Sequence, residues 1–162
     1  HQILVVYPSN QEMDLNLMRN ATSADWAELL NKMQDSASVE AEGIGQILAM
    51  AGNPNDPVAT AMGRTNVAYQ LSVDDPAIYA SAWSDLVNDN RQEGNVSYLS
   101  SVFAYGANPG THVAINVYSS LGEALSNPPQ TMKGFDVFLK RVSGIRTVEG
   151  RVVTTVVGEW RP

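Results

Sequence analysis

Residues 1–25, HQILVVYPSNQEMDLNLMRNATSAD, return in altered form as residues 112–136, HVAINVYSSLGEALSNPPQTMKGFD. The same offset aligns Val6 with Val117, Tyr7 with Tyr118, Ser9 with Ser120, Glu12 with Glu123, Asn16 with Asn127 and Asp25 with Asp136. A duplicated unit is the simplest account of this match. Residues 64–110 precede the second copy and have no counterpart before the first. We therefore expect residues 1–57 to be a partial repeat that is incomplete at its N-terminus, and residues 58–162 to be a complete one.

Composition excludes several classes of protein. The 162 residues contain 44% hydrophobic and 17% charged residues and carry a formal net charge of −7. An acidic chain repels phosphate groups, so we expect no binding to nucleic acid or to anionic membranes. No apolar run approaches the roughly 18 residues of a membrane span. The absence of cysteine excludes disulfides and thiolate chemistry and leaves the compartment undetermined, since no targeting segment is visible.

Hydrophobic periodicity predicts the elements. In the first copy, the β-branched run Ile3 to Tyr7 predicts a strand, and helical residues follow from Ser9, with a second helix capped by Ser23. A further strand is expected over residues 43–51. In the second part we expect strands at 66–73, 96–105, 113–118 and 151–160 and helices at 75–88, 119–126 and 132–142, with a turn at 106–110. The complete unit thus has the order β-α-β-β-α-α-β.

This duplicated order resembles the dimeric α+β barrel superfamily, which is built from ferredoxin-like units. The resemblance rests on element order, on Asp74-Asp75-Pro76 at the start of a helix and on Gly110-Thr111-His112 before a strand. It covers residues 64–160 and, as a partial copy, residues 1–51. It implies an α+β fold with antiparallel sheets that carry helices on one face, and two such sheets facing each other. Function does not follow from this fold.

Alternation along the strand at residues 112–118 suggests a ligand site. We expect Val113, Ile115 and Val117 to face the helices and His112, Asn116 and Tyr118 to face the barrel interior. Alternatively, His112 closes a turn and Tyr118 belongs to the core.

Gln70 and Ser72 are expected to point into the same interior as Asn116, where they would orient a carbonyl or hydroxyl group of a ligand. The alternative is that they are polar filler between two sheets. No P-loop, GxGxxG, HExxH or nucleophile elbow occurs, and we expect neither a metal nor a cofactor.

Two functions remain open. The first is a binding domain whose barrel holds a small apolar or aromatic molecule. The second is a cofactor-independent monooxygenase-like enzyme in which His112 acts as acid or base and Asn116 polarises a carbonyl. In either case the incomplete first repeat leaves strand edges unpaired, which predicts a homodimer.

Overall fold

The computed structural model describes residues 3–38, 43–91, 93–105 and 110–159. The contacts divide the chain into two compact units, residues 1–40 and 41–162. The turn expected at residues 106–110 lies almost entirely outside the described residues, as does Trp160. The predicted boundary between repeats, after residue 57, stays a prediction.

The first unit contains two consecutive helices, α1 (Asn10–Thr22) and α2 (Ala24–Gln34). Ser9 and Ser23 cap them as expected, because each hydroxyl accepts a hydrogen bond from a backbone N–H of the first turn. The strand predicted for Ile3 to Tyr7 is wrong. Ile3, Leu4, Val5 and Val6 are 60–77% exposed, and no described strand pairs with them. Without a hydrogen-bonded neighbour an apolar, β-branched segment does not form a strand.

The two copies of the sequence repeat make matching local contacts. Ser9 accepts from the N–H of Glu12 at the start of α1, and Ser120 accepts from the N–H of Glu123 at the start of α4 (Leu121–Ser126). The Tyr7 hydroxyl donates to Asn16 Oδ1 at 3.1 Å, and the Tyr118 hydroxyl donates to the backbone oxygen of Asn127 at 3.3 Å. These are contacts that a duplicated unit would share, although the duplication itself stays a prediction.

The second unit is an α+β fold built on one antiparallel sheet, in the order β1-β3-β4-β2-β5. The strands are β1 (Gly43–Ala51), β2 (Thr65–Val73), β3 (Val96–Tyr105), β4 (His112–Tyr118) and β5 (Arg146–Thr155). The order of β2 to β5 along the chain and in the sheet is compatible with a ferredoxin-like class. β1, which the sequence predicts to belong to the first repeat, is hydrogen-bonded to the outer side of β3.

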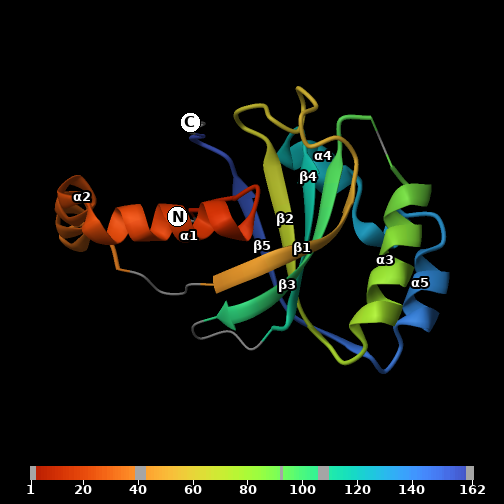
Figure 1. The fold of residues 1–162 in the computed structure, drawn as a ribbon. Helices are drawn as coiled ribbons and strands as arrows, with labels where there is room; N and C mark the ends of the chain where they lie inside the picture. The colour runs from red at the N-terminus through yellow and green to blue at the C-terminus, as the bar shows by residue number, and fades with distance from the viewer. Residues whose placement is uncertain (1–2, 39–42, 92, 106–109, 160–162) are drawn as a thin grey trace. The chain divides into compact units, whose positions relative to one another are not determined.

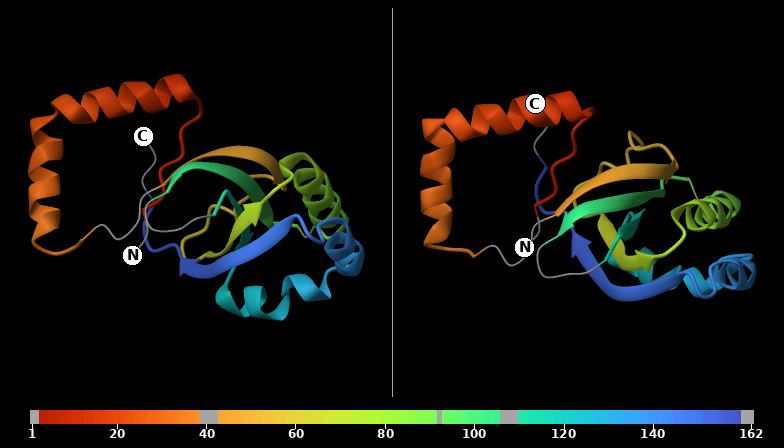
Figure 2. Two further views of the ribbon diagram at one scale, coloured as in Figure 1. Left: turned by 90° about the horizontal axis from the view of Figure 1, so that it is seen from below. Right: turned by 60° about the horizontal axis from the view of Figure 1, so that its bottom comes forward.

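Helices α3 (Pro76–Asp89) and α5 (Phe135–Arg141) lie side by side on one face of this sheet (Figures 1 and 2). Trp83 of α3 and Phe138 of α5 pack on Leu71 and Leu99 of the sheet, and all four side chains are at least 95% buried. Asp75 caps α3 and Pro76 occupies its first turn, as the sequence predicts. A 3-10 turn (Pro129–Thr131) lies between α4 and α5. No described helix is long and apolar enough to cross a bilayer.

β5 begins five residues earlier than the predicted start at Arg151. β2 extends to Val73, which pairs with Arg146. β5 can therefore pair with β2 as soon as the chain leaves the turn at Gly144, where φ is positive. Glu149 and Gly150 do not precede the strand but form an irregularity inside it, opposite Gln70.

Candidate functional site

The strand register separates the five predicted site residues onto two faces of the sheet. Residues directly opposite in an antiparallel ladder share a face, and His112 pairs with Leu71, whose side chain is in the core under the helices. Asn116 and Tyr118 alternate in phase with His112, so all three face α3 and α5. Gln70 and Ser72 alternate out of phase with Leu71 and lie on the opposite face.

The expectation that these residues share one interior is therefore wrong, and so is the helix-facing assignment of Val113, Ile115 and Val117. The reason is that the more apolar side of β4 does not face the helices. Val117 packs with Val96 and Ala59 in a second small core, away from the helices. The alternation in β4 is clear, but its polar side is the one that faces the helices, so alternation alone identified the wrong side.

Asn116 and Tyr118 meet at a small cavity of about 100 Å³ on the helix side. Its walls come from the ends of several elements that are distant in sequence. The main polar lining residues are Asn90, Asn95, Ser97, Asn116, Tyr118, Asn127 and Thr131. The side chains that face this space are mostly amides and hydroxyls, an arrangement that suits hydrogen bonding to a neutral molecule.

A hydrogen-bonded chain crosses the floor of the cavity. Ser97 Oγ donates to Asn116 Oδ1 at 2.8 Å, and the Asn116 side chain is hydrogen-bonded to the Tyr118 hydroxyl. Burial, with smaller contributions from Tyr69 and Glu123, raises the pKa of Tyr118 to about 12. Tyr118 is therefore a neutral phenol at physiological pH and serves as a hydrogen-bond donor rather than as a base.

One carboxylate stands behind the cavity wall. Asn95 Nδ2 donates to Glu123 Oε1 at 3.0 Å, and the backbone N–H of Ser119 donates to Glu123 Oε2 at 2.7 Å. Burial alone would raise the pKa of Glu123, but the hydrogen bonds from Ser119 and Asn95 outweigh it and lower the pKa. Glu123 thus stays charged behind the wall, where its negative charge disfavours an anion, while the solvent-exposed Arg91 is the cation among the lining residues.

His112 lies outside this cavity. Four residues of extended strand, or roughly 13 Å, separate it from Asn116. Its Nδ1 is 2.9 Å from Thr111 Oγ1, and burial lowers its pKa. No ionisable neighbour contributes to that shift. The structure therefore does not bring together the His112 and Asn116 pair that an acid–base mechanism would use.

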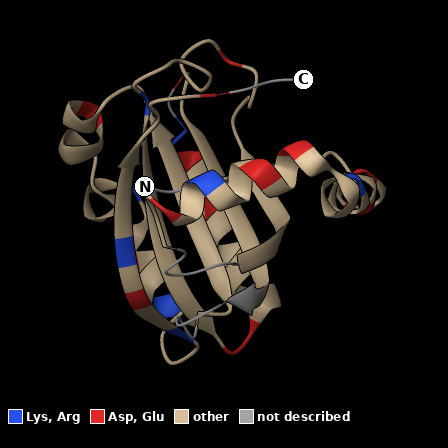
Figure 3. Ribbon diagram, turned by 90° about the vertical axis from the view of Figure 1, so that its left-hand side faces the viewer, with Lys and Arg blue, Asp and Glu red and all other residues tan. Residues whose placement is uncertain are grey.

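Gln70 and Ser72 belong to the sheet face opposite α3 and α5, which we call the open face. Strands β1 to β4 contain no Lys, Arg, Asp or Glu, and the charged residues of the sheet stand on β5 (Figure 3). Arg146 and Arg151 of β5 are on the helix side, over the rings of Phe138 and Tyr69, and Glu149 is exposed at the irregularity of β5. The open face consists of Ile47, Met50, Asn66, Ala68, Gln70, Ser72, Val96, Tyr98, Ser100, Val113, Ile115, Val117, Thr147, Gly150, Val152 and Thr154.

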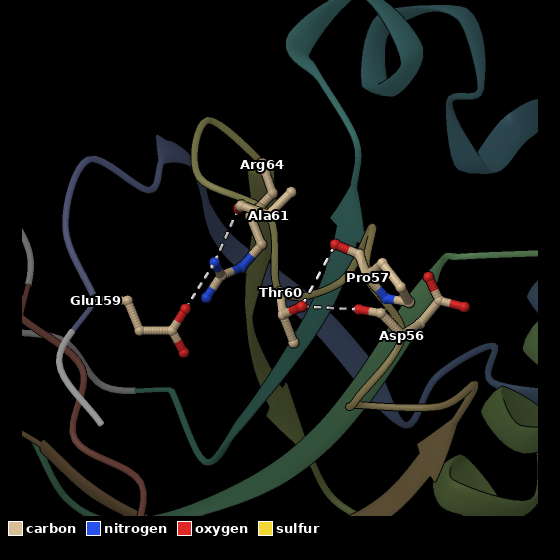
Figure 4. Close-up of polar contacts among 6 residues, drawn as sticks. All are labelled: Asp56, Pro57, Thr60, Ala61, Arg64 and Glu159. Carbon is tan, nitrogen blue, oxygen red and sulfur yellow. Dashed lines mark hydrogen bonds and ion pairs between the residues drawn. The ribbon is translucent and has the colours of Figure 1, made fainter. Parts of the chain in front are cut away.

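One end of the open face is bounded by the loop before β2. Arg64 Nη1 donates to the backbone oxygen of Ala61 at 3.0 Å and to Glu159 Oε2 at 3.2 Å, and Thr60 Oγ1 donates to the backbone oxygen of Asp56 at 3.1 Å (Figure 4). The Arg64 side chain is only 14% exposed. These contacts fasten the loop to the segment that follows β5, so that Ala59 stays packed on the end of the sheet.

Sequence reasoning identified two cavity residues and missed the others. Asn90 and Asn127 are the C-cap residues of α3 and α4, a position where asparagine usually has a structural explanation. Ser97 gave no signal at all. Within the described ranges, no three His, Asp or Glu side chains are grouped closely enough to hold a metal ion. No family model matches the chain, and neither a curated protein nor a solved structure matches it.

Proposed function

We propose that this chain is a non-catalytic binding domain that pairs with a second copy through the open face and holds a small apolar or aromatic molecule between the two sheets. The observation that carries the proposal is that strands β1 to β4 have no charged side chain on the sheet face opposite α3 and α5. Ile47, Met50 and Val152 on this face are 40–49% exposed. They stand on the edge strands β1 and β5, with the half-buried Val113 and Ile115 of β4 between them, and an apolar face of this kind is a candidate interaction site.

A second copy is the partner that this surface fits. An isologous contact places the same face on both sides, so neither side requires a complementary charge. No charged side chain of β1 to β4 would lose its water on pairing, which lowers the cost of burying this surface. The outer edges of β1 and β5 have no strand partner among the described residues, so they are available at the rim of such a contact. The resemblance to dimeric α+β barrels implies the same arrangement, in which the sheets of two ferredoxin-like units face each other.

Gln70 and Ser72 remain the ligand-binding candidates of this interior. They stand among Ala68, Ile115 and Val152, so the surface combines an apolar majority with a few polar groups, as small-molecule sites do. We do not extend the proposal to the enzymatic alternative, because His112 lies on the other face and apart from Asn116.

The test compares two variants of the edge strand β5, each of which introduces one carboxylate on one face of the sheet. Val152 is 40% exposed on the open face, and its neighbour Val153 is 50% exposed on the helix face. Light scattering should give the wild type a mass near twice 17.5 kDa. Val152→Asp should give a monomer, whereas Val153→Asp should leave the dimer intact. A monomeric wild type, or equal dissociation by both variants, would overturn the proposal.

Ligand binding has its own readout. The fluorescent dye 1-anilinonaphthalene-8-sulfonate, whose aromatic rings bind apolar surfaces, should bind the wild-type dimer with a stoichiometry of one site per pair of chains, and Val152→Asp should abolish that binding. Binding that is unchanged in the variant would place the dye elsewhere and remove the support for an enclosed ligand.

A further inference from the structure

We infer that the cavity between the ends of α3, α4 and the sheet is a separate binding site for a small, uncharged molecule of the carboxamide class. This inference is independent of the open face, because the cavity lies on the helix side of the sheet. It rests on the size of the cavity, on the hydrogen-bonding groups of its floor and on the charges around it.

Size limits the ligand. The cavity measures about 100 Å³. Since one water takes up about 30 Å³ in the liquid, the space holds about three waters or one molecule of about four heavy atoms. Drug-sized ligands occupy pockets of about 300–1,000 Å³ and are excluded. The apolar or aromatic molecule expected from the sequence is therefore not the occupant of this cavity.

The polar groups on the floor of the cavity favour a ligand that both accepts and donates hydrogen bonds. Asn116 is 8% exposed and has two amide N–H groups. One is used in its contact with the Tyr118 hydroxyl, and its Oδ1 is used by Ser97. Its second N–H has no acceptor among the described residues, and Ser97 Oγ keeps the capacity to accept. A carboxamide satisfies both, since its carbonyl accepts from Asn116 and its N–H donates to Ser97.

The charged residues around the cavity disfavour a charged ligand. Glu123, which is hydrogen-bonded to the wall residue Asn95, repels a carboxylate. No carboxylate lines the cavity itself to pair with a cation, and the one basic lining residue, Arg91, is exposed to solvent. An ion entering this space would lose its hydration water and find no buried counter-charge to compensate. A neutral molecule needs no counter-charge.

The experiment titrates acetamide into the full ¹⁵N-labelled chain and follows the side-chain amide resonances by NMR. For four heavy atoms the tightest dissociation constant is on the order of 10⁻⁵ to 10⁻⁴ M, so the titration should extend to about 100 mM. We expect the Asn116 side-chain resonances to move with saturation. Acetate, which has the same shape and a negative charge, should bind at least about tenfold more weakly, because it lacks the N–H donor and is repelled by Glu123.

Two serine variants on one strand provide the matched control. Ser97→Ala removes the acceptor and should weaken acetamide binding about five- to tenfold. Ser101→Ala makes the same change on the same face of β3, beside His112 and outside the cavity, and should leave binding unchanged. The absence of any Asn116 shift at about 100 mM acetamide, equal affinity for acetate, or equal effects of the two variants would each overturn the inference. None of these results depends on the oligomeric state.

Discussion

Replacing Thr65 by valine should stabilise the protein. Thr65 is fully buried at the start of β2, on the helix face, where it pairs with Tyr118 on one side and Thr155 on the other. Its hydroxyl has no hydrogen-bond partner among the described residues. A buried hydroxyl without a partner costs about 1–3 kcal/mol, and valine has nearly the same shape with a methyl group in its place.

We expect Thr65→Val to raise the free energy of unfolding by about 1–2 kcal/mol. For a chain of this size the midpoint of thermal unfolding should rise by about 2–8 °C. Circular dichroism melts and urea titrations measure both quantities. Thr111→Val is the control, because Thr111 Oγ1 accepts from the N–H of Val73 at 2.9 Å. The same change there should cost about 1 kcal/mol. Equal losses of stability in both variants would mean that a bound water satisfies Thr65, and would refute the reasoning.

Two further predictions concern pH and backbone conformation. Burial lowers the pKa of His112, so the unfolded chain takes up this proton more readily than the folded chain. Stability is therefore retained above the unfolded pKa of about 6.5 and falls as the pH drops below it. Urea unfolding of wild type and His112→Gln between about pH 5 and 7.5 should show a smaller loss in the variant, and parallel curves would contradict this. Gly52 has a φ of +97°, and an added Cβ would collide with the carbonyl oxygen of Asn95, whereas Gly134 has a φ of +78° and open space around it. Gly52→Ala should thus cost roughly 3 kcal/mol or more and Gly134→Ala about 1 kcal/mol, and the reverse order in thermal melts would show that the close approach at Gly52 is unimportant.

Most elements were predictable because their signals are local. Asp75 followed by Pro76 specifies the start of α3 within a few residues, and Ser9 and Ser23 specify α1 and α2 in the same way. Strand formation is different, since it depends on a partner. The apolar run that begins at Ile3 has the composition of a strand and no ladder to join, so composition alone gave the wrong answer.

The candidate site was less predictable because its geometry depends on packing between distant segments. Which face of β4 meets the helices is decided by where Trp83 and Leu99 pack, not by alternation within β4. The cavity is likewise formed by the ends of helices and strands whose residues are widely separated along the chain. Asn116 and Tyr118 were recognisable as polar groups on one strand, whereas Ser97 could be identified only from the ladder that sets it opposite Asn116.

The tyrosine–asparagine contacts described for the two copies also bear on the order in which the chain folds. Tyr7 meets Asn16, and Tyr118 meets Asn127, across only nine positions, so each loop closes at small entropic cost and in well under a millisecond. The ladder of β5 on β2 joins two strands with α3, β3, β4, α4 and α5 between them in the chain, so we expect it to form after those elements become ordered. We therefore expect β5 to be the last strand to pair. Until it pairs, the edge of β2 is exposed, and we expect strand exchange between chains to be most frequent in that interval.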